Sequence, residues 1–401
     1  MTRTLFAHGT VVDGTGTDPS VADIVVEDGR VVEVGVGLDG DDRVDLAGKA
    51  VLPGLFDCHT HVMVSSIDTM RLLQTPFSYR FFQAVHNLET TLRIGITTIR
   101  DAGGADLGVK QAIEDGLVRG PRMQISLSMV SQTGGHGDDW MPFGGTVQEM
   151  LPPHPGVPET LVDGPDEMRR KVRELIRMGA DVIKVAVSGG VLSPRDKPTH
   201  AHFRPAELEV LVEEATAAGI FVMAHAQAAP GIKNAIRAGI RSIDHGIYLD
   251  DEAIELMLEH GTWLVPTLVA PRGVIDAADA GAAIPDASVA KAREVIETHR
   301  ASFAKAVSAG VKVAMGTDSG VTPHGNNLRE LALMVERGMT PMQALVATTR
   351  TAAELMRLED ELGTLEPGKR ADLVVINGDP LDVATLADRV ESVYKDGTRV
   401  V

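Results

Sequence analysis

The chain has 401 residues, 44% of them apolar, so it is long enough for a barrel of about 250 residues and a smaller second unit. Its 56 acidic residues outnumber 38 basic ones, and the resulting net charge of −18 argues against a nucleic-acid or anionic-membrane surface. Cys58 is the single cysteine, which excludes an internal disulfide and a four-cysteine zinc site.

Residues 1 to about 53 contain short alternating apolar runs broken by Gly and Asp, as in ADIVVEDGRVVEVG. This alternation is typical of antiparallel strands and hairpins. The N-terminal sequence MTRTLFAHGTVVDG lacks the apolar stretch of a signal peptide, and no apolar run of about 18 residues follows it. We therefore expect a cytoplasmic protein that has neither nucleic acid nor membrane as a partner.

After Pro53 the pattern changes to an apolar strand, a polar loop, an amphipathic helix and then a glycine before the next strand. The repeated junctions are RMGADVIKV, AAGIFVMAH, RAGIRSIDH, EHGTWLVPT and SAGVKVAMG, with Gly179, Gly219, Gly239, Gly261 and Gly310 closing the helices. Together with GLFDCHTHV, ITTIRDAGG and MQISLSMV they give eight candidate strands. This alternation favours a (β/α)8 TIM barrel over an open doubly wound sheet.

Near the C-terminus, ADLVVING and VESVYKDGTRVV are strand-like with no helix between them. We expect them to join the N-terminal strands, so that the α/β barrel carries a small discontinuous β-sandwich domain from both termini. The predicted boundaries are 1–54 and 359–401 for the sandwich and 55–358 for the barrel. Two connections are predicted to be long and irregular: WMPFGGTVQEMLPPHPGVPETLVDG and residues 269 to about 287.

His59 and His61 lie on one face of the first barrel strand, because side chains alternate along a strand. Two imidazoles placed in this way can share one metal ion. Taken alone, the pair is equally consistent with two polar residues at a strand end.

Lys184 stands in the apolar run VIKVAV, where an inward ammonium needs compensation. It could pair with a carboxylate such as Asp101 or Asp318. Alternatively, reaction with CO2 would give a carbamate whose two oxygens can bridge two cations.

The remaining candidates end other barrel strands: His225 in FVMAHA, His245 in RSIDHG and Asp318 in AMGTDSG. Active sites of such barrels are built at the carboxyl ends of the strands. A carboxylate there can bind metal and accept a proton from metal-bound water. The coincidence of these candidates at strand ends favours a metal centre over unrelated structural roles.

With these motifs the sequence resembles the amidohydrolase superfamily. The motifs are HTH at 59–61, the lysine of VIKV, AH at 224–225, DHG at 244–246, GTD at 316–318 and GTLEPGKRADLVVINGDP. GGHGD at 134–138, VSGGVLSP at 187–194 and RSIDHG resemble its prolidase-related branch, which includes Xaa-Pro dipeptidases and N-acyl amino acid hydrolases.

The resemblance implies two divalent metal ions, expected to be Zn²⁺, bridged by Lys184 carboxylated by CO2. His59, His61 and Asp318 would hold one ion, and His225 and His245 the other. Asp318 would also shuttle the proton, and His136 would polarise the scissile carbonyl. The branch often has tyrosine after His-Ala, where this chain has Gln227 in AHAQ, so Gln227 is a predicted substrate-binding residue that bears on recognition of a C-terminal carboxylate.

The expected activity is hydrolysis of an amide C–N bond of a small molecule, such as a dipeptide or an N-acyl amino acid, by a hydroxide that bridges the metals. The same site could instead open a lactone or a phosphate ester. A non-catalytic scaffold on the same barrel is the third interpretation, because a fold alone does not establish activity. We also expect a homo-oligomer.

Overall fold

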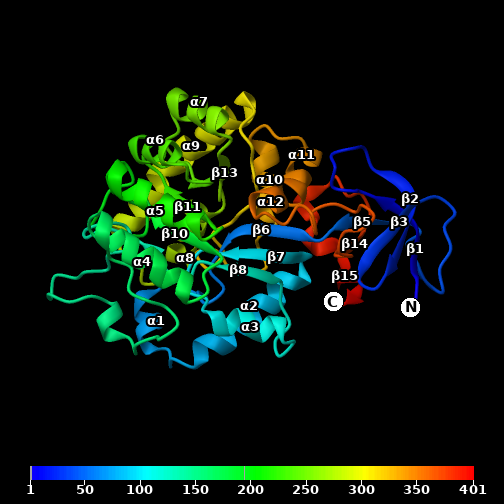
Figure 1. Ribbon diagram of the computed structural model, residues 1–401, viewed down its shortest axis with the longest axis horizontal. Coiled ribbons are helices and arrows are strands. Elements are labelled where there is room, and N and C mark those ends of the chain that lie inside the picture. Colours follow the sequence, from blue (N-terminus) through cyan, green and yellow to red (C-terminus); the bar gives the residue numbers. More distant parts are fainter. Residues whose placement is uncertain (1, 194) are drawn as a thin grey trace.

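In the computed structural model, which describes residues 2–193 and 195–401, both ends of the chain build one β sheet (Figure 1). Met1 and Pro194, the last residue of the VSGGVLSP motif, lie outside the described residues. The N-terminal strands are β1 (Thr4–Val11), β2 (Ser20–Glu27), β3 (Arg30–Gly35), β4 (Asp42–Asp45) and β5 (Lys49–Pro53). The C-terminal strands are β14 (Leu373–Asn377), β15 (Val390–Lys395) and β16 (Thr398–Arg399). Their order is β16-β15-β14-β5-β1-β2-β3, with β4 beside β1, so β5 and β14 join the two parts.

This sheet curls over its own apolar face. Phe6 on β1 and Tyr394 on β15 meet edge to face at 4.9 Å between ring centroids, although the two strands are three positions apart in the sheet. In a flat sheet that separation would be about 14 Å. Alternate residues of β14 serve two cores: Leu373 and Val375 face the sandwich interior, whereas Val374 and Ile376 pack against the core of the barrel. The discontinuous sandwich predicted from the sequence is confirmed, while its exact boundaries stay a prediction.

Parallel strands surround the second core and form the barrel. They are β6 (Leu55–Thr60), β7 (Ile96–Asp101), β8 (Arg122–Ile125), β9 (Met129–Val130), β10 (Val182–Ala186), β11 (Phe221–Ala226), β12 (Ser242–His245) and β13 (Trp263–Val265). β8 and β9 are two halves of the third barrel strand, since β8 pairs with β7 and β9 pairs with β10.

Residues 311–319 complete the circle as the eighth strand segment. The Ala314 N–H donates to the Leu264 carbonyl on β13 at 3.0 Å, and the Cys58 N–H on β6 donates to the Met315 carbonyl at 2.9 Å. Parallel bridges at Leu264 and Thr60 mark the same closure. The predicted barrel is therefore confirmed.

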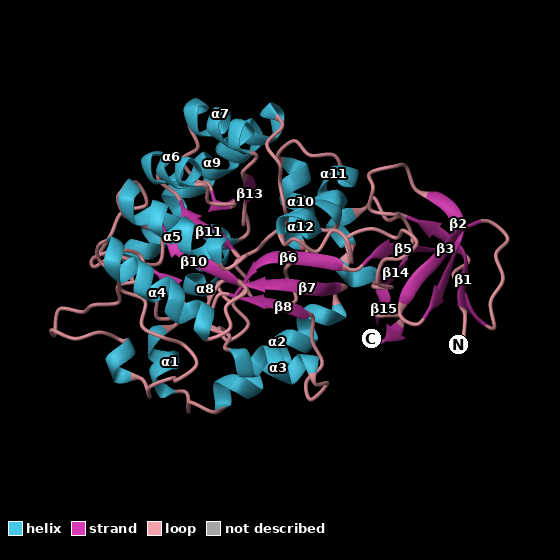
Figure 2. Cartoon of the chain, in the orientation of Figure 1, coloured by secondary structure: helices cyan, strands magenta, loops and turns pink. Residues whose placement is uncertain are grey.

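Helices cover the outside of the barrel, as Figure 2 shows in cyan around the magenta strands. They are α1 (Thr69–Gln74), α2 (Tyr79–Arg93), α3 (Leu107–Glu114), α4 (Pro165–Arg177), α5 (Pro205–Ala217), α6 (Ala229–Ala238), α7 (Asp251–His260), α8 (Ala270–Asp279), α9 (Asp286–Ala309), α10 (Arg329–Glu336), α11 (Pro341–Ala347) and α12 (Arg350–Leu355). Short 3-10 turns are η1 (Gln148–Met150), η2 (Val383–Thr385) and η3 (Ala387–Arg389). Gly239, Gly261 and Gly310 end α6, α7 and α9 in the left-handed conformation, which glycine adopts without steric cost.

One of the two connections expected to be irregular is largely helical. Residues 269–287 contain α8 and the start of α9, so that prediction was wrong. Pro271 lies in the first turn of α8, where its missing N–H costs nothing, and the alanines that follow favour helix. Val274 and Ile275 then bury themselves in a core shared with α9. The other connection, between β9 and α4, is irregular except for η1, as expected.

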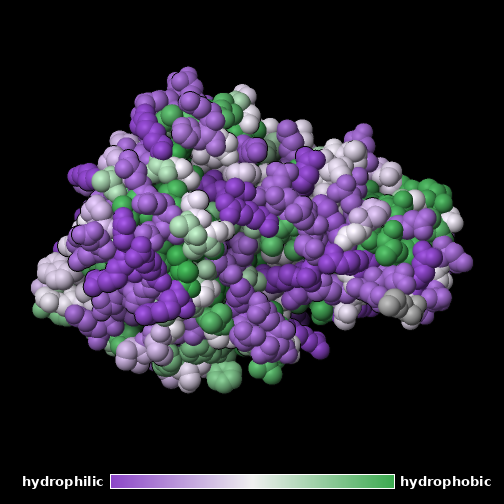
Figure 3. All heavy atoms as spheres, in the orientation of Figure 1, coloured by the Kyte–Doolittle hydropathy of each residue, from purple (hydrophilic) through white to green (hydrophobic). Residues whose placement is uncertain are grey.

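Among the residues that the structure describes, no helix is both long enough and apolar enough to cross a membrane. Hydrophilic side chains cover most of the face shown in Figure 3.

Candidate metal centre

The side chains expected to bind metal come together at the carboxyl ends of the barrel strands. His59 lies near the end of β6 and His61 directly follows that strand. Lys184 lies in β10, His225 in β11 and His245 at the end of β12, and Asp318 lies near the end of the eighth strand segment. The side chains are buried except those of His61 and Asp318, which are 23% and 15% exposed. These two mark the side of the cluster that opens toward solvent.

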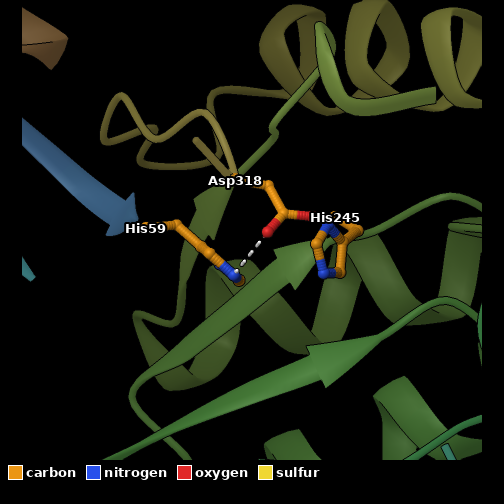
Figure 4. Close-up of side chains that lie close together, drawn as sticks. All are labelled: His59, His245 and Asp318. Atoms are coloured by element: carbon orange, nitrogen blue, oxygen red, sulfur yellow. Dashed lines mark ion pairs between the residues drawn. The ribbon is translucent and has the colours of Figure 1, made fainter. Parts of the chain in front are cut away.

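His59, His245 and Asp318 form the tightest part of the cluster (Figure 4). One donor atom from each lies within 4.8 Å of the others, close enough to hold one ion or two ions about 3.5–4 Å apart. Asp318 Oδ1 is 3.5 Å from His59 Nε2 and 3.2 Å from His61 Nε2. His225 adjoins this group through His245, with 4.6 Å between their ring centroids.

The hydrogen bonds of the histidines show which nitrogens remain as ligands. His61 Nδ1 donates to the Gly103 carbonyl at 2.8 Å, and His59 Nδ1 donates to the Asp244 carboxylate at 2.7 Å. In the neutral form each imidazole has one N–H, so both Nε2 atoms would then present lone pairs toward Asp318. Lone pairs that face a carboxylate need a proton or a cation between them. The donor set, nitrogen and oxygen, suits Zn²⁺.

His225 has the opposite arrangement, because its Nε2 donates to the Gly189 carbonyl at 3.2 Å and leaves Nδ1 available. Its ring stacks on His136, with centroids 4.0 Å apart and planes 15° from parallel. Burial lowers the pKa of His225 well below its usual value, so the ring is neutral and able to act as a ligand.

Lys184 faces a different carboxylate from the two considered in the sequence. Its Nζ lies 3.8 Å from Asp244 Oδ2 and 3.4 Å from His59 Nε2. Asp101, by contrast, accepts backbone N–H bonds from Val62, Gly103 and Ala105 and caps that loop. Burial lowers the pKa of Lys184 to about 8 against the opposing effect of Asp244, so part of the amine is neutral at physiological pH.

His136 reaches the cluster from the long loop after β9. Its Nδ1 is 2.8 Å from Ser193 Oγ and 3.7 Å from Asp196 Oδ2. Gly190 lies directly beneath the ring, since a Cβ there would be 2.2 Å from it. Glycine at 190 is therefore required for His136 to occupy this place.

Lys291 on α9 fixes the loop that carries these partners. Its ammonium donates to the carbonyls of Gly190, Ser193 and Asp196 at 3.0, 2.6 and 2.8 Å. The helix thus holds the wall of the site that positions His136.

Gln227 lines a small cavity of about 50 Å³ beside His225, His245 and Asp318. Its Oε1 is buried without a hydrogen-bond partner among the described residues. Most other lining side chains are apolar: Val191, Leu192, Ile247, Ala270, Pro271, Val274 and Val321. No lysine or arginine of the described chain lines this cavity.

Sequence reasoning missed the residues that orient the histidines. Asp244 contacts His59, Arg100 contacts Asp244, and Thr267 Oγ1 lies 2.7 Å from His245 Nδ1. The available signals were Asp244 directly before His245 and a charged residue, Arg100, inside the buried strand ITTIRD.

Backbone strain accompanies these contacts. His245, Thr267 and Asp318 have φ angles of 74°, 53° and 61°, a region that residues other than glycine seldom adopt. Each such residue costs about 1–3 kcal/mol, and strain of this kind clusters at functional sites. Three of the nine such residues in the described chain lie in this one cluster, which marks it as a candidate functional region.

Comparison with known proteins gives matches over nearly the whole chain. A family model described as the amidohydrolase family matches residues 50–400. Ochratoxinase from Aspergillus niger is 35% identical over 399 residues, covering 94% of this chain and 82% of that protein. The crystal structure of a Xaa-Pro dipeptidase with bound methionine in the active site matches with a TM-score of 0.89 at 33% sequence identity. The crystal structure of a prolidase complexed with N-methylphosphonate-L-proline matches with a TM-score of 0.91 at 36% sequence identity. Each match covers 99% of this chain and 99% of the other chain.

Proposed function

The chain belongs to the amidohydrolase family, and from this membership we propose that it hydrolyses an amide C–N bond in a small molecule such as a dipeptide or an N-acyl amino acid. Within the family it lies in the prolidase-related branch. The observation that carries the proposal is the convergence of nitrogen and oxygen donors on Asp318 at the open end of the barrel.

The site would hold two divalent cations, in our proposal Zn²⁺. His59, His61 and Asp318 would bind one, and His225 and His245 the other. Bound divalent cations supply Lewis acidity, which lowers the pKa of water and polarises a carbonyl.

Lys184 would bridge both ions after reaction with CO2. The lone pair of neutral Nζ forms the new N–C bond, and the nitrogen releases a proton to solvent, so that an anionic carbamate replaces a cationic ammonium. The lowered pKa of Lys184 supports this step, because the neutral amine is the reactive form.

The chain's own groups would then move protons and orient the substrate. Asp318 Oδ would accept the proton of the attacking water and pass it to the leaving nitrogen, a contribution of about 10²–10⁴-fold in rate. His136 Nε2 would donate to the oxygen of the scissile carbonyl, while Ser193 and Asp196 hold the other side of the ring.

The decisive experiment combines metal stoichiometry with a substrate panel. Chelator-treated protein is reloaded with Zn²⁺, and N-acyl amino acids, Xaa-Pro and other dipeptides, cyclic amides, lactones and phosphotriesters are assayed side by side. We expect two bound metals per chain and amide hydrolysis that the chelator abolishes. His59→Asn should lose bound metal and amide hydrolysis. His260→Gln, at the end of α7, is the matched control and should keep both properties.

Two outcomes would contradict this function. Hydrolysis restricted to lactones or phosphotriesters would reassign the reaction to ester bonds at the same site. Full metal content with no turnover of any substrate class would favour a non-catalytic scaffold.

A further inference from the structure

Asp244 is an ionised side chain enclosed within the barrel, below the cluster of candidate ligands. The residue has no solvent exposure, and neither does Arg100, whose Nη2 lies 3.3 Å from both carboxylate oxygens. Ser242 Oγ donates to Asp244 Oδ1 at 2.8 Å. The carboxylate therefore has its charge balanced and its position fixed from one side.

The guanidinium of Arg100 is itself held by the barrel. Its Nε donates to the Cys58 carbonyl on β6 at 2.6 Å, and its Nη1 donates to Ser242 Oγ at 3.2 Å. Arg100 thus links β7 to β6 and β12, the two strands that carry His59 and His245. A buried charge pair is retained at a net cost unless such contacts compensate its desolvation.

The other side of Asp244 faces His59. Oδ2 accepts the Nδ1–H of His59 at 2.7 Å, which leaves Nε2 unprotonated in the neutral ring. That Nε2 lies 3.5 Å from Asp318 Oδ1 and points into the ligand cluster. Because Arg100 already balances Asp244, Lys184 at 3.8 Å is not needed as its counter-ion.

We propose that Asp244, held by Arg100 and Ser242, is a positioning residue that fixes His59 as the Nδ1–H tautomer and so keeps Nε2 available as a ligand. The part that concerns metal rests on the proposed function. Hydrogen-bond partners of this kind orient metal-binding histidines in proteins, and their loss typically lowers metal affinity about 10–100-fold.

Asp244→Asn tests the proposal because the amide should reverse the tautomer. Its oxygen would stay with the donors Arg100 and Ser242, so its NH2 would face His59 Nδ1 and favour a proton on Nε2. Long-range ¹H–¹⁵N correlation spectra of the metal-free protein, with labelled histidine, report this tautomer directly. Zn²⁺ dissociation constants from chelator competition report the consequence.

We expect Nδ1–H in the parent, Nε2–H in Asp244→Asn, and Zn²⁺ affinity reduced about 10–100-fold in the variant. Asp181→Asn is the matched control, since Asp181 also forms an ion pair, with Lys110 at 2.7 Å, but lies before β10, at the opposite end of the barrel. It should lose thermal stability without changing the His59 tautomer or the Zn²⁺ affinity.

If Asp244→Asn does not fold, Ser242→Ala tests the role of Asp244 instead. It removes only the hydroxyl that donates to Asp244 Oδ1. We expect it to raise the fraction of His59 in the Nε2–H form and to lower Zn²⁺ affinity less than Asp244→Asn does. A variant that folds and keeps both the parent tautomer and the parent affinity would overturn the proposal. A parent that binds no Zn²⁺ would refute the proposed function, while the tautomer spectra would still test the role of Asp244.

Discussion

The amine of Lys184 is buried between His59 and Asp244, next to the candidate metal ligands. Lys184→Ala should lose metal as well as activity, since it removes the proposed bridge between the ions. Metal analysis and amide hydrolysis, each with and without added small carboxylates, measure the loss and its partial rescue. Lys110→Ala, which breaks the pair with Asp181 outside the site, should keep both. Full occupancy of both metals in Lys184→Ala would rule out the bridging role.

Asp318 has two proposed roles, metal binding and proton transfer, and a substitution can separate them. Against the opposing effect of burial, a proton on the facing imidazoles of His59 and His61 holds the pKa of Asp318 below its usual range in the absence of a metal ion. Asp318→Asn should reduce kcat by about 10²–10⁴-fold while most of the metal remains bound. Near-normal kcat on an amide substrate would assign the proton transfer to another group.

Gln227 bears on which amides are accepted. The adjoining cavity is mostly apolar and its described lining contains no basic side chain, so it favours an uncharged, apolar substrate group. Gln227→Tyr should raise kcat/KM for an N-acyl amino acid relative to its C-terminal amide, because a phenol hydrogen bond to a carboxylate contributes about 1.5–3 kcal/mol. A parent enzyme that strictly requires the free carboxylate, with no gain from tyrosine, would show that position 227 does not set specificity.

At the scale of single residues, the sequence indicates which side chains end barrel strands but not what orients them. His59 and Asp244 are 185 positions apart, and their contact depends on how β6 and β12 face each other across the barrel. No local pattern encodes that distance. The structure places Lys184 beside the cluster, and the carboxylate next to its Nζ is Asp244, not Asp101 or Asp318 as the sequence suggests.

At the scale of elements, glycine before an apolar run proved a reliable guide to helix ends. Gly179 and Gly219 follow α4 and α5 and have φ angles of 93° and 77°. This left-handed conformation ends each helix and turns the chain back toward the next strand. The sequence of α8 did not indicate a helix, because its Gly, Ala and Pro residues also occur in loops. Their helical state depends on packing against α9, which the local sequence does not contain.

Glu330 connects α10 to the loop that carries Thr267, and this connection should depend on pH. Its oxygens accept the N–H groups of Leu268 and Val269 at 2.7 and 2.9 Å, and burial raises its pKa from 4.5 to about 8. The unfolded chain thus releases this proton at lower pH than the folded protein. The stabilisation is complete below about pH 4.5 and is lost as the pH rises to about 8.

Glu330→Gln removes this titration and tests its direction. Between about pH 5.5 and 7.5 the parent should lose up to about 1.4 kcal/mol of unfolding free energy per pH unit more than the variant. Urea unfolding at several pH values measures both slopes, and every other titrating group is common to the two proteins. Equal slopes would show that Glu330 does not carry a raised pKa.

At the scale of the whole molecule, the barrel packs against a sheet that contains strands from both ends of the chain. β14 lies in the interior of that sheet, and Leu373, Val374, Val375 and Ile376 are essentially inaccessible to solvent. Burial of each such side chain contributes about 1.5–3 kcal/mol, so the four together approach the total stability of a typical domain.

Deletion of residues 372–401 should therefore abolish cooperative folding rather than trim an accessory part. Thermal unfolding followed by circular dichroism, together with the yield of unaggregated protein, measures the effect. Deletion of residues 398–401 is the control, because it removes only β16, both of whose residues are exposed at the sheet edge, and the two residues that follow it. A chain ending at 371 that unfolds cooperatively and binds Zn²⁺ would show that the barrel is independent of the sheet.

The pairing of β5 with β14 also fixes when the protein can finish folding during its synthesis. β5 ends at Pro53 and β14 begins at Leu373, a gap of 320 residues. At about 5–20 residues per second, the ribosome needs roughly 16–64 s to supply the missing partner. Throughout that interval the edge of β5 and the part of the apolar face that β14 and β15 cover stay open, so the nascent N-terminal strands remain exposed to misassembly until the last residues are made.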